Sequence, residues 1–215
     1  MTRRRAGWWT VLLGGCGVCA GALLAPAGPA PEPRDFGPRS DGAAVERRAG
    51  TTAEQRPGTA PEERAERRPV RLVLPRLGVR ATVVPVGVTD GGDLAVPGDA
   101  RRVGWYRFGG VPAPDGGSTV LVGHVDSRSR GLGALAALRS VRRGDRVGIR
   151  LSGGDREHYR VTARRSVAKE RFPARVFRRS GPSALTLVTC TGPFLPERGG
   201  YQRILLVTAV PAAAP

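Results

Sequence analysis

The sequence predicts an all-β domain, a small barrel or sandwich, which follows an N-terminal membrane segment and a spacer. From residue 69 onward, short runs of β-branched and apolar residues alternate with Gly, Pro and Asp. Turns that recur at intervals of roughly 10–20 residues are typical of small β-barrels and sandwiches. Between residues 26 and 68 no such runs occur. With 215 residues, the chain has room for one domain of ordinary size and its tails.

Residues 1–25 are predicted to be a single-pass membrane anchor. Arg3–Arg5 precede an uncharged stretch whose apolar centre, Trp8–Ala25, has the minimum length for a helix that crosses a bilayer. Cations before this stretch, with none directly after it, place the N-terminus inside the cell. Two alternatives remain open: a signal peptide cleaved at Ala25–Ala27, and a lipoprotein modified at Cys16. All three place the rest of the chain on the extracellular face of the cell membrane.

Residues 26–68 are predicted to form a disordered spacer. They contain eight arginines and eight acidic residues, and their only aromatic residue is Phe36. Such a segment cannot bury enough apolar area to offset the entropy lost on ordering. The third region, residues 69–215, is predicted to be the catalytic domain described below.

The whole chain has a net charge of +17, and residues 69–215 carry 24 cations against 10 acidic residues. Such a basic domain can bind nucleic acid, but it can equally face an anionic cell wall or phospholipid headgroups. Because no recognisable nucleic-acid motif is present, we expect no specific nucleic-acid partner. Lys169 is the only lysine, and this preference for arginine is typical of a GC-rich genome. Two of the three cysteines fall in the apolar stretch, which excludes a disulfide framework.

The apolar runs define the predicted strands. A continuous run indicates a strand buried on both faces, and strict alternation indicates a half-buried one. The expected strands are Val70–Leu74, Ala81–Val88, Leu94–Val96, Thr119–His124, Arg146–Leu151, Tyr159–Ala163, Ala184–Cys190 and Ile204–Val210. One short helix is expected at Leu132–Leu138 and a second helical turn at Phe172–Phe177.

Three residues are candidates for chemistry. Cys190 and His124 each end a predicted strand, where a side chain reaches the rim of a barrel, and Arg203 opens the strand after Cys190. A thiol needs a base or a cationic neighbour to act as a nucleophile near neutral pH. A guanidinium can hold a developing oxyanion. Taken singly, each residue also has an ordinary structural explanation: a buried small side chain, a turn residue and a surface charge.

The sequence around these residues resembles the sortases, cysteine transpeptidases that attach surface proteins in Gram-positive bacteria. Thr186–Cys190 matches the TLxTC motif, and Gly123–Asp126 resembles the GHxD stretch that carries the sortase histidine. Val103–Tyr106 and Phe172–Phe177 are similar to actinobacterial class F, or class E, sortases in particular. The likeness extends over residues 70–210.

The resemblance implies a closed eight-stranded β-barrel with one or two short helices. It also implies that Cys190 is the nucleophile, His124 the acid/base partner, and Arg203 the residue that stabilises the oxyanion. Class F members commonly read Y-R-D-N-V-V-V where this chain reads Y-Q-R-I-L-L-V, so Arg203 is displaced by one position. A one-residue displacement along a strand reverses the face of a side chain, unless a bulge restores it. Arg198 is the alternative arginine.

Five further residues belong to the expected site. Asp126 can orient the imidazole ring or form a turn. Thr189, Phe172, Val176 and Phe177 can line the groove for a sorting signal, although packing explains them equally well. No metal site is expected, because acidic residues are scattered and no His/Cys/Asp cluster has metal-ligand spacing. No cofactor is expected.

The predicted function is therefore that of an enzyme, a hydrolase-like cysteine transpeptidase. It would cleave an LPxTG-like sorting signal through a thioacyl intermediate and transfer the product to an amine acceptor, such as a cell-wall precursor. Its partners would be exported proteins with a C-terminal sorting signal. The alternative is a non-catalytic envelope-binding module that retains the barrel, an interpretation favoured by the displaced Arg203. L,D-transpeptidases and papain-like proteases do not fit, because their cysteine and histidine have other spacing or order.

Overall fold

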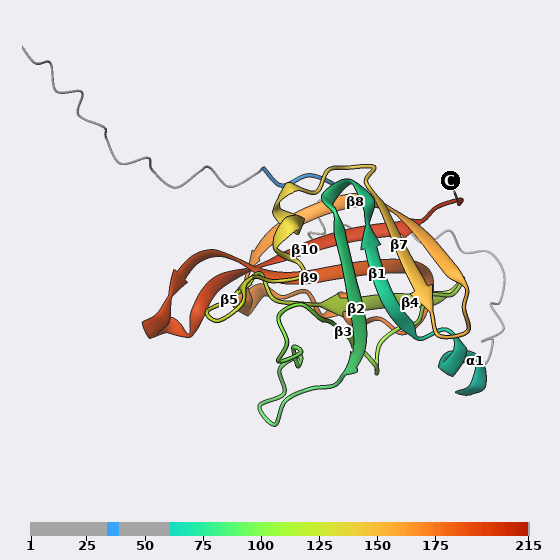
Figure 1. Ribbon diagram of the computed structural model, residues 1–215, viewed down its shortest axis with the longest axis horizontal. Helices are drawn as coiled ribbons and strands as arrows, with labels where there is room; N and C mark the ends of the chain where they lie inside the picture. The colour runs from blue at the N-terminus through green and yellow to red at the C-terminus, as the bar shows by residue number, and fades with distance from the viewer. Residues whose placement is uncertain (1–33, 39–60, 215) are drawn as a thin grey trace, which may run out of the picture. The chain divides into compact units, whose positions relative to one another are not determined.

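A closed eight-stranded barrel forms the core of the computed structural model, which describes residues 34–38 and 61–214 (Figure 1). Around the barrel the strands follow the order β1, β2, β3, β4, β9, β10, β8, β7. Their bounds are β1 Pro69–Leu74, β2 Val79–Val86, β3 Val103–Tyr106, β4 Gly116–Val122, β7 Arg146–Leu151, β8 Arg156–Ala168, β9 Gly181–Leu195 and β10 Gly200–Pro211. The closed eight-stranded barrel expected from the resemblance is confirmed.

Most neighbouring strands are antiparallel, but β2 pairs with β3, and β4 with β9, in parallel. The second pairing determines the site, because it aligns the end of β4, just before His124, with the part of β9 just before Cys190. Parallel neighbours need a crossover connection. The crossover between β4 and β9 contains a small ribbon, β5 Asp126–Ser127 with β6 Gly131–Leu132, as well as the β7–β8 hairpin.

The predicted helices are shorter than expected and belong to the 3₁₀ type. Residues expected to form the first helix contribute to η2, Ala136–Ser140, and the second expected turn is η4, Ala174–Phe177. The remaining helical segments are α1 Pro61–Glu66, η1 Pro75–Leu77, η3 Lys169–Arg171 and η5 Pro196–Arg198. Short helical turns of this kind are common as connectors between strands.

Three strand predictions need correction. Leu94–Val96 is not a strand and contributes only a single bridge between Leu94 and Val88. Val103–Tyr106 forms β3, although its residues were not expected to be a strand. Cys190 does not end its strand, because β9 continues to Leu195. The last pair between β9 and β4 joins Val188 to Val122, and beyond it β9 pairs only with β10. Cys190 therefore lies just past the last β4–β9 pair, near the base of the β9–β10 hairpin. This hairpin projects from the barrel in Figure 1.

Alternation along β9 and β10 separates two apolar clusters. Leu185, Leu187, Leu205 and Val207 point into the barrel and belong to its main core. Val188, Leu206 and Ile204 point outward, where a second cluster includes Val176 from η4. The connection between β8 and β9 thus covers the outer face of the sheet and creates a second, smaller core next to Cys190.

Two parts of the expected spacer have defined structure, which corrects the prediction of disorder for these residues. Phe36 exchanges two backbone hydrogen bonds with Arg164 on β8, at 3.0 and 2.9 Å. The Asp35 carboxylate accepts a hydrogen bond from the backbone N–H of Ser166. In α1, the Arg64 guanidinium donates to the carbonyl oxygen of Gly109 at 2.8 Å. Backbone pairing with an existing strand supplies the stability that the spacer's composition does not.

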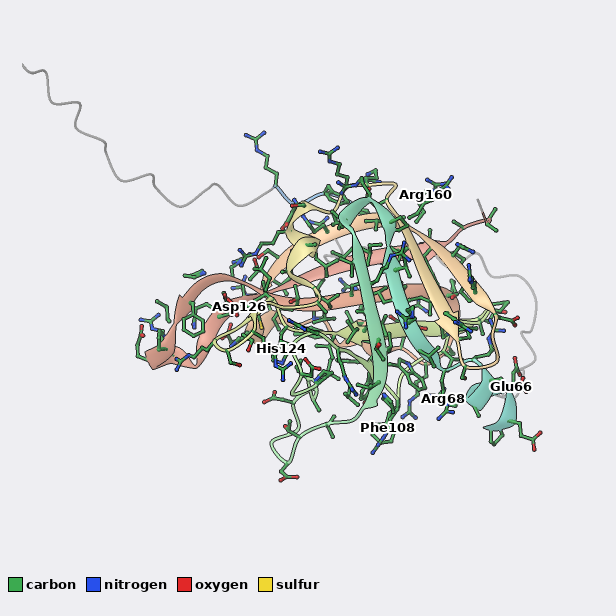
Figure 2. The ribbon with its side chains drawn as sticks, viewed as in Figure 1. Glu66, Arg68, Phe108, His124, Asp126 and Arg160 are labelled. Atoms are coloured by element: carbon green, nitrogen blue, oxygen red, sulfur yellow. The ribbon has the colours of Figure 1, made fainter. Side chains whose placement is uncertain are left out.

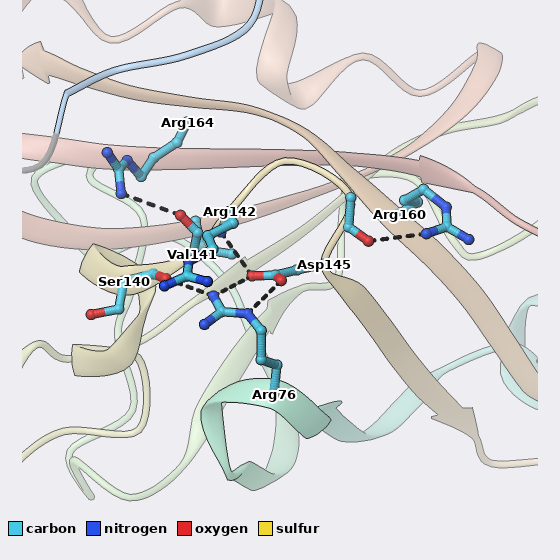
Figure 3. A network of polar contacts seen from close by, with 8 residues as sticks. Arg76, Ser140, Val141, Arg142, Asp145, Arg160 and Arg164 are labelled. Atoms are coloured by element: carbon cyan, nitrogen blue, oxygen red, sulfur yellow. Dashed lines mark hydrogen bonds and ion pairs between the residues drawn. The ribbon is translucent and has the colours of Figure 1, made fainter.

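A network of ion pairs and hydrogen bonds joins η1 to the segment between η2 and β7 (Figure 3). The Arg76 guanidinium donates to both carboxylate oxygens of Asp145, at 2.5 and 2.6 Å, and to the carbonyl oxygen of Ser140 at 2.6 Å. Asp145 also accepts from the backbone N–H of Arg142 at 2.7 Å. Buried Arg164 donates to the carbonyl oxygen of Arg139 at 2.6 Å. This network ties the β1–β2 connection to the segment before β7, and Arg164 ties that segment to β8.

The predicted anchor, residues 1–25, lies outside the described residues, as does most of the spacer. Among the helices that the structure does describe, none has the length and apolar character needed to cross a membrane.

Candidate functional site

Two hydrogen bonds between β9 and the residue after β4 bring His124 and Cys190 to the same part of the rim. The backbone N–H of Gly123 donates to the carbonyl oxygen of Val188 at 3.0 Å. The Thr189 hydroxyl donates to the carbonyl oxygen of Gly123 at 2.8 Å. His124 directly follows Gly123, and Cys190 directly follows Thr189. These two bonds therefore fix the spacing of the backbone at His124 and Cys190.

Both side chains line one hollow on the outer face of the barrel. The volume of this hollow is about 670 Å³. Its apolar wall is contributed by Val88, Leu94, Val96, Tyr106, Val122, Phe172, Phe177, Val188 and Ile204. Its polar or titratable lining residues are Asp93, His124, Lys169, Thr189 and Cys190. An apolar hollow lined by a few polar groups is typical of a binding site.

Cys190 is a half-buried free thiol. Burial raises the pKa of Cys190 above its usual value, the positive charge of Lys169 lowers it, and the negative charge of Asp126 raises it further. The raised pKa means that the resting thiol is protonated at neutral pH. A reaction at this sulfur therefore needs a base to remove the proton and a cation to stabilise the thiolate.

The imidazole ring of His124 is held by a backbone carbonyl. Its Nε2 atom lies 2.9 Å from the carbonyl oxygen of Pro97, and since a carbonyl can only accept, Nε2 carries the proton. Of the two roles left open for Asp126, no hydrogen bond between Asp126 and this ring supports the first within the described residues. The Asp126 carboxylate instead accepts a hydrogen bond from the Tyr201 hydroxyl on β10. Figure 2 shows His124 and Asp126 near the end of the barrel from which the β9–β10 hairpin projects.

The structure does not bring Arg203 to the thiol. Ile204 is the cross-strand partner of Cys190, whereas Arg203 is the partner of Thr191. Adjacent residues of a strand point to opposite faces, so Arg203 and Cys190 lie on different sides of the sheet. The Arg203 guanidinium is bound to Ser166 on β8, donating to its hydroxyl at 2.6 Å and to its carbonyl oxygen at 2.7 Å. A bulge does occur nearby, but it lies between Thr191 and Phe194, beyond Arg203.

Arg198, the alternative arginine, is part of η5 at the tip of the hairpin and does not line the hollow. Lys169 does line it, beside Cys190. In the sequence, Lys169 is distinguished only as the single lysine of the chain, and that is the one signal that points to it.

The four expected groove residues take different positions. Phe172 and Phe177 line the hollow and stack on each other, with ring centroids 5.5 Å apart. Thr189 also lines the hollow. Val176 is buried in the outer cluster and is absent from the lining, so it supports the wall from behind. Within residues 34–38 and 61–214, no group of three or more His, Cys, Asp or Glu side chains is arranged to hold a metal ion.

The structure is thus a closed barrel with one cysteine and one histidine in the same rim hollow. The family comparison is more specific, because residues 72–212 match the model of the sortase domain. The chain therefore belongs to the sortase family. No curated protein matches its sequence significantly.

Solved sortase structures share the fold at low sequence identity. Sortase C1 of Streptococcus agalactiae matches with a TM-score of 0.53 and 21% identity, over 67% of each chain. A lid mutant of sortase A from Corynebacterium diphtheriae matches with a TM-score of 0.52 and 21% identity, over 68% of this chain and 72% of that one. Sortase C-1 of Actinomyces oris has a TM-score of 0.50 and 24% identity, with 68% and 76% covered.

Proposed function

We propose that this protein is a cysteine transpeptidase that cleaves an LPxTG-like sorting signal and joins the acyl fragment to an amine acceptor. The observation that carries the proposal is the shared hollow of Cys190 and His124, with an apolar wall that can hold an extended peptide. Family membership supports the same chemistry. On the strength of Val103–Tyr106 and Phe172–Phe177, we place it nearest to class F or class E sortases.

In the proposed reaction, His124 takes the proton of the Cys190 thiol as the sulfur attacks the scissile carbonyl carbon. The tetrahedral intermediate then collapses, the C–N bond breaks, and His124 gives the proton to the departing amine. The resulting thioester is attacked by the acceptor amine, which loses a proton while the Cys190 sulfur leaves and is protonated again. A cell-wall precursor is the proposed acceptor.

The proposed location is the extracellular face of the cell membrane, with residues 1–25 as anchor. This location supplies the two partners that the reaction needs, exported proteins bearing a C-terminal signal and an amine of the envelope. The basic surface then faces anionic envelope polymers rather than nucleic acid.

One observation favours the second candidate, a non-catalytic envelope-binding module. Among the described residues that line the hollow there is no arginine, and the displaced Arg203 is bound to Ser166. Such a protein would not turn over a sorting signal, but its apolar hollow would still bind an envelope ligand.

Mass spectrometry of the full-length chain incubated with LPxTG-type peptides separates the two. A transpeptidase gives an acyl adduct on Cys190 that an added amine releases as a new amide. Binding without any adduct, across a panel of varied sorting motifs, would establish the binding module. Cys190→Ala is the matched control, because it keeps the hollow and removes only the sulfur.

A further inference from the structure

Lys169 occupies the position in which this site requires a cation. The backbone row that contains Cys190 crosses three adjacent strands: Cys190 pairs with Ile204 on β10, and Ile204 pairs with Val167 on β8. Lys169 follows Val167 by two residues, and the intervening Ala168 has extended backbone angles, φ −65° and ψ 147°. Since side chains two residues apart along extended backbone share a face, Lys169 lies on the Cys190 side of the sheet.

The side chain of Lys169 has little other bonding. Within the part of the chain that the structure describes, its Nζ atom donates only to the carbonyl oxygen of Gly199, over a long 3.4 Å contact. A hydrogen bond of that length is weak, so the ammonium group keeps donors available for a substrate. Arg203, by contrast, belongs to the row Thr191–Arg203–Ala168 and makes two short bonds to Ser166.

Resting on the transpeptidase proposed above, we propose that Lys169 is the catalytic cation of this site. Its ammonium group stabilises the Cys190 thiolate and then donates to the oxyanion that forms on the scissile carbonyl. The proton of the thiol still goes to His124, and no further reactant is needed. The electrostatic effect of Lys169 on the thiol agrees in direction, since it lowers the pKa of Cys190.

The groups that face the thiol have opposing effects on it. The negative charge of Asp126, which accepts a hydrogen bond from Tyr201, raises the pKa of Cys190, and the positive charge of Lys169 lowers it. Removal of Lys169 leaves the carboxylate of Asp126 and burial unopposed. The thiolate then becomes harder to form, and the oxyanion loses its charged donor.

The first test measures the thiol without any substrate, so it is independent of the proposed function. Full-length protein with Cys16→Ser and Cys19→Ser carries Cys190 as its only thiol, and its alkylation by iodoacetamide is followed from about pH 5 to about pH 10. Lys169→Met is expected to slow alkylation about three- to fivefold near neutral pH and to shift the acid limb upward by about one pH unit. Lys169→Arg should retain the wild-type profile.

The matched control is Arg171→Met, which removes one positive charge from the same turn, η3, at an exposed position outside the hollow. It should leave the profile unchanged. An unchanged profile for Lys169→Met, or an equal shift for Arg171→Met, would overturn the proposal. A shift for Arg203→Met alone would assign the role to Arg203 instead.

The second test uses peptide transfer. Lys169→Met should lower kcat about 10²-fold with a small change in KM, since the contribution lies in the transition state. Gln202 lies two residues from Ile204, on the Cys190 face of β10. Adding Gln202→Arg to Lys169→Met should therefore recover part of the lost kcat. If wild type forms no adduct with any peptide, the transpeptidase proposal fails, while the alkylation profile still decides whether Lys169 acts on the thiol.

Discussion

Two polar clusters of this barrel differ in how completely their groups are bonded. In the Arg76–Asp145 network, the carboxylate accepts three short hydrogen bonds, from a guanidinium and a backbone N–H (Figure 3). In the rim hollow, Lys169 has one long contact and His124 is held at one ring nitrogen. Saturated groups contribute to stability, whereas groups with free donors and acceptors can meet a substrate. The first cluster is therefore expected to affect folding alone, and the second to affect chemistry.

Cys190→Ala should give the largest effect on chemistry. Loss of the nucleophile should lower peptide cleavage by at least about 10⁴-fold, because no thioester can form. The thermal melting temperature should change by less than about 3 °C, since only a half-buried sulfur is removed. Peptide cleavage followed by chromatography, together with thermal melts, checks both parts. Residual turnover near the wild-type level would assign the nucleophile to another residue.

The sequence predicts the barrel better than it predicts the site, for a physical reason. Alternating and continuous apolar runs record burial directly, so β7 is predicted with its observed bounds, Arg146–Leu151. β3 escapes detection because four residues are too few to establish a period. Gly192, with φ 81°, and the following proline resemble a turn but form a bulge within β9.

Side-chain direction at the rim depends on register, which spacing does not determine. The thirteen-residue interval between Cys190 and Arg203 is compatible with either face of β10. Only the observed pairing of Ile204 with Cys190 shows that the Arg203 side chain points away from the thiol. Lys169 begins η3, directly after the end of β8, and belongs to neither motif, so no motif spacing could place it in the hollow with the thiol.

Asp145→Asn tests the saturated cluster. The substitution keeps the shape but removes the charge that Arg76 pairs with, and should lower the free energy of unfolding by about 1–3 kcal/mol. The corresponding fall in melting temperature is roughly 3–10 °C. Alkylation of Cys190 and peptide cleavage should remain at wild-type levels. A loss of cleavage in a fully folded variant would contradict the separation of the two clusters.

The stability conferred by Asp145 should also depend on pH. Burial favours the neutral acid, but the hydrogen bonds from Arg76 and from the Arg142 N–H outweigh it and hold the pKa of Asp145 below its usual value. A carboxyl with a lowered folded-state pKa contributes stability above its unfolded-state pKa, about 3.9, and loses it as the pH falls through the folded-state value. Thermal melts of wild type and Asp145→Asn should therefore differ most near neutral pH and converge below about pH 4. A constant difference down to low pH would contradict this assignment.

The smallest effect expected concerns two buried threonines on neighbouring strands. The Thr189 hydroxyl bonds to the carbonyl oxygen of Gly123 and so couples the backbones next to Cys190 and His124. Thr189→Val keeps the shape and removes this bond, which should cost about 1 kcal/mol and slow peptide cleavage about fivefold. Thr119→Val is the matched control, because the hydroxyl of Thr119 is buried in β4 and has no hydrogen-bond partner among residues 34–38 and 61–214. Its removal should leave cleavage unchanged and stability equal or slightly higher, since no bond is lost and a buried polar group disappears. Equal losses of cleavage in both variants would mean that packing of the β4–β9 pair, and not the Thr189 bond, sets the spacing of the two reactive side chains.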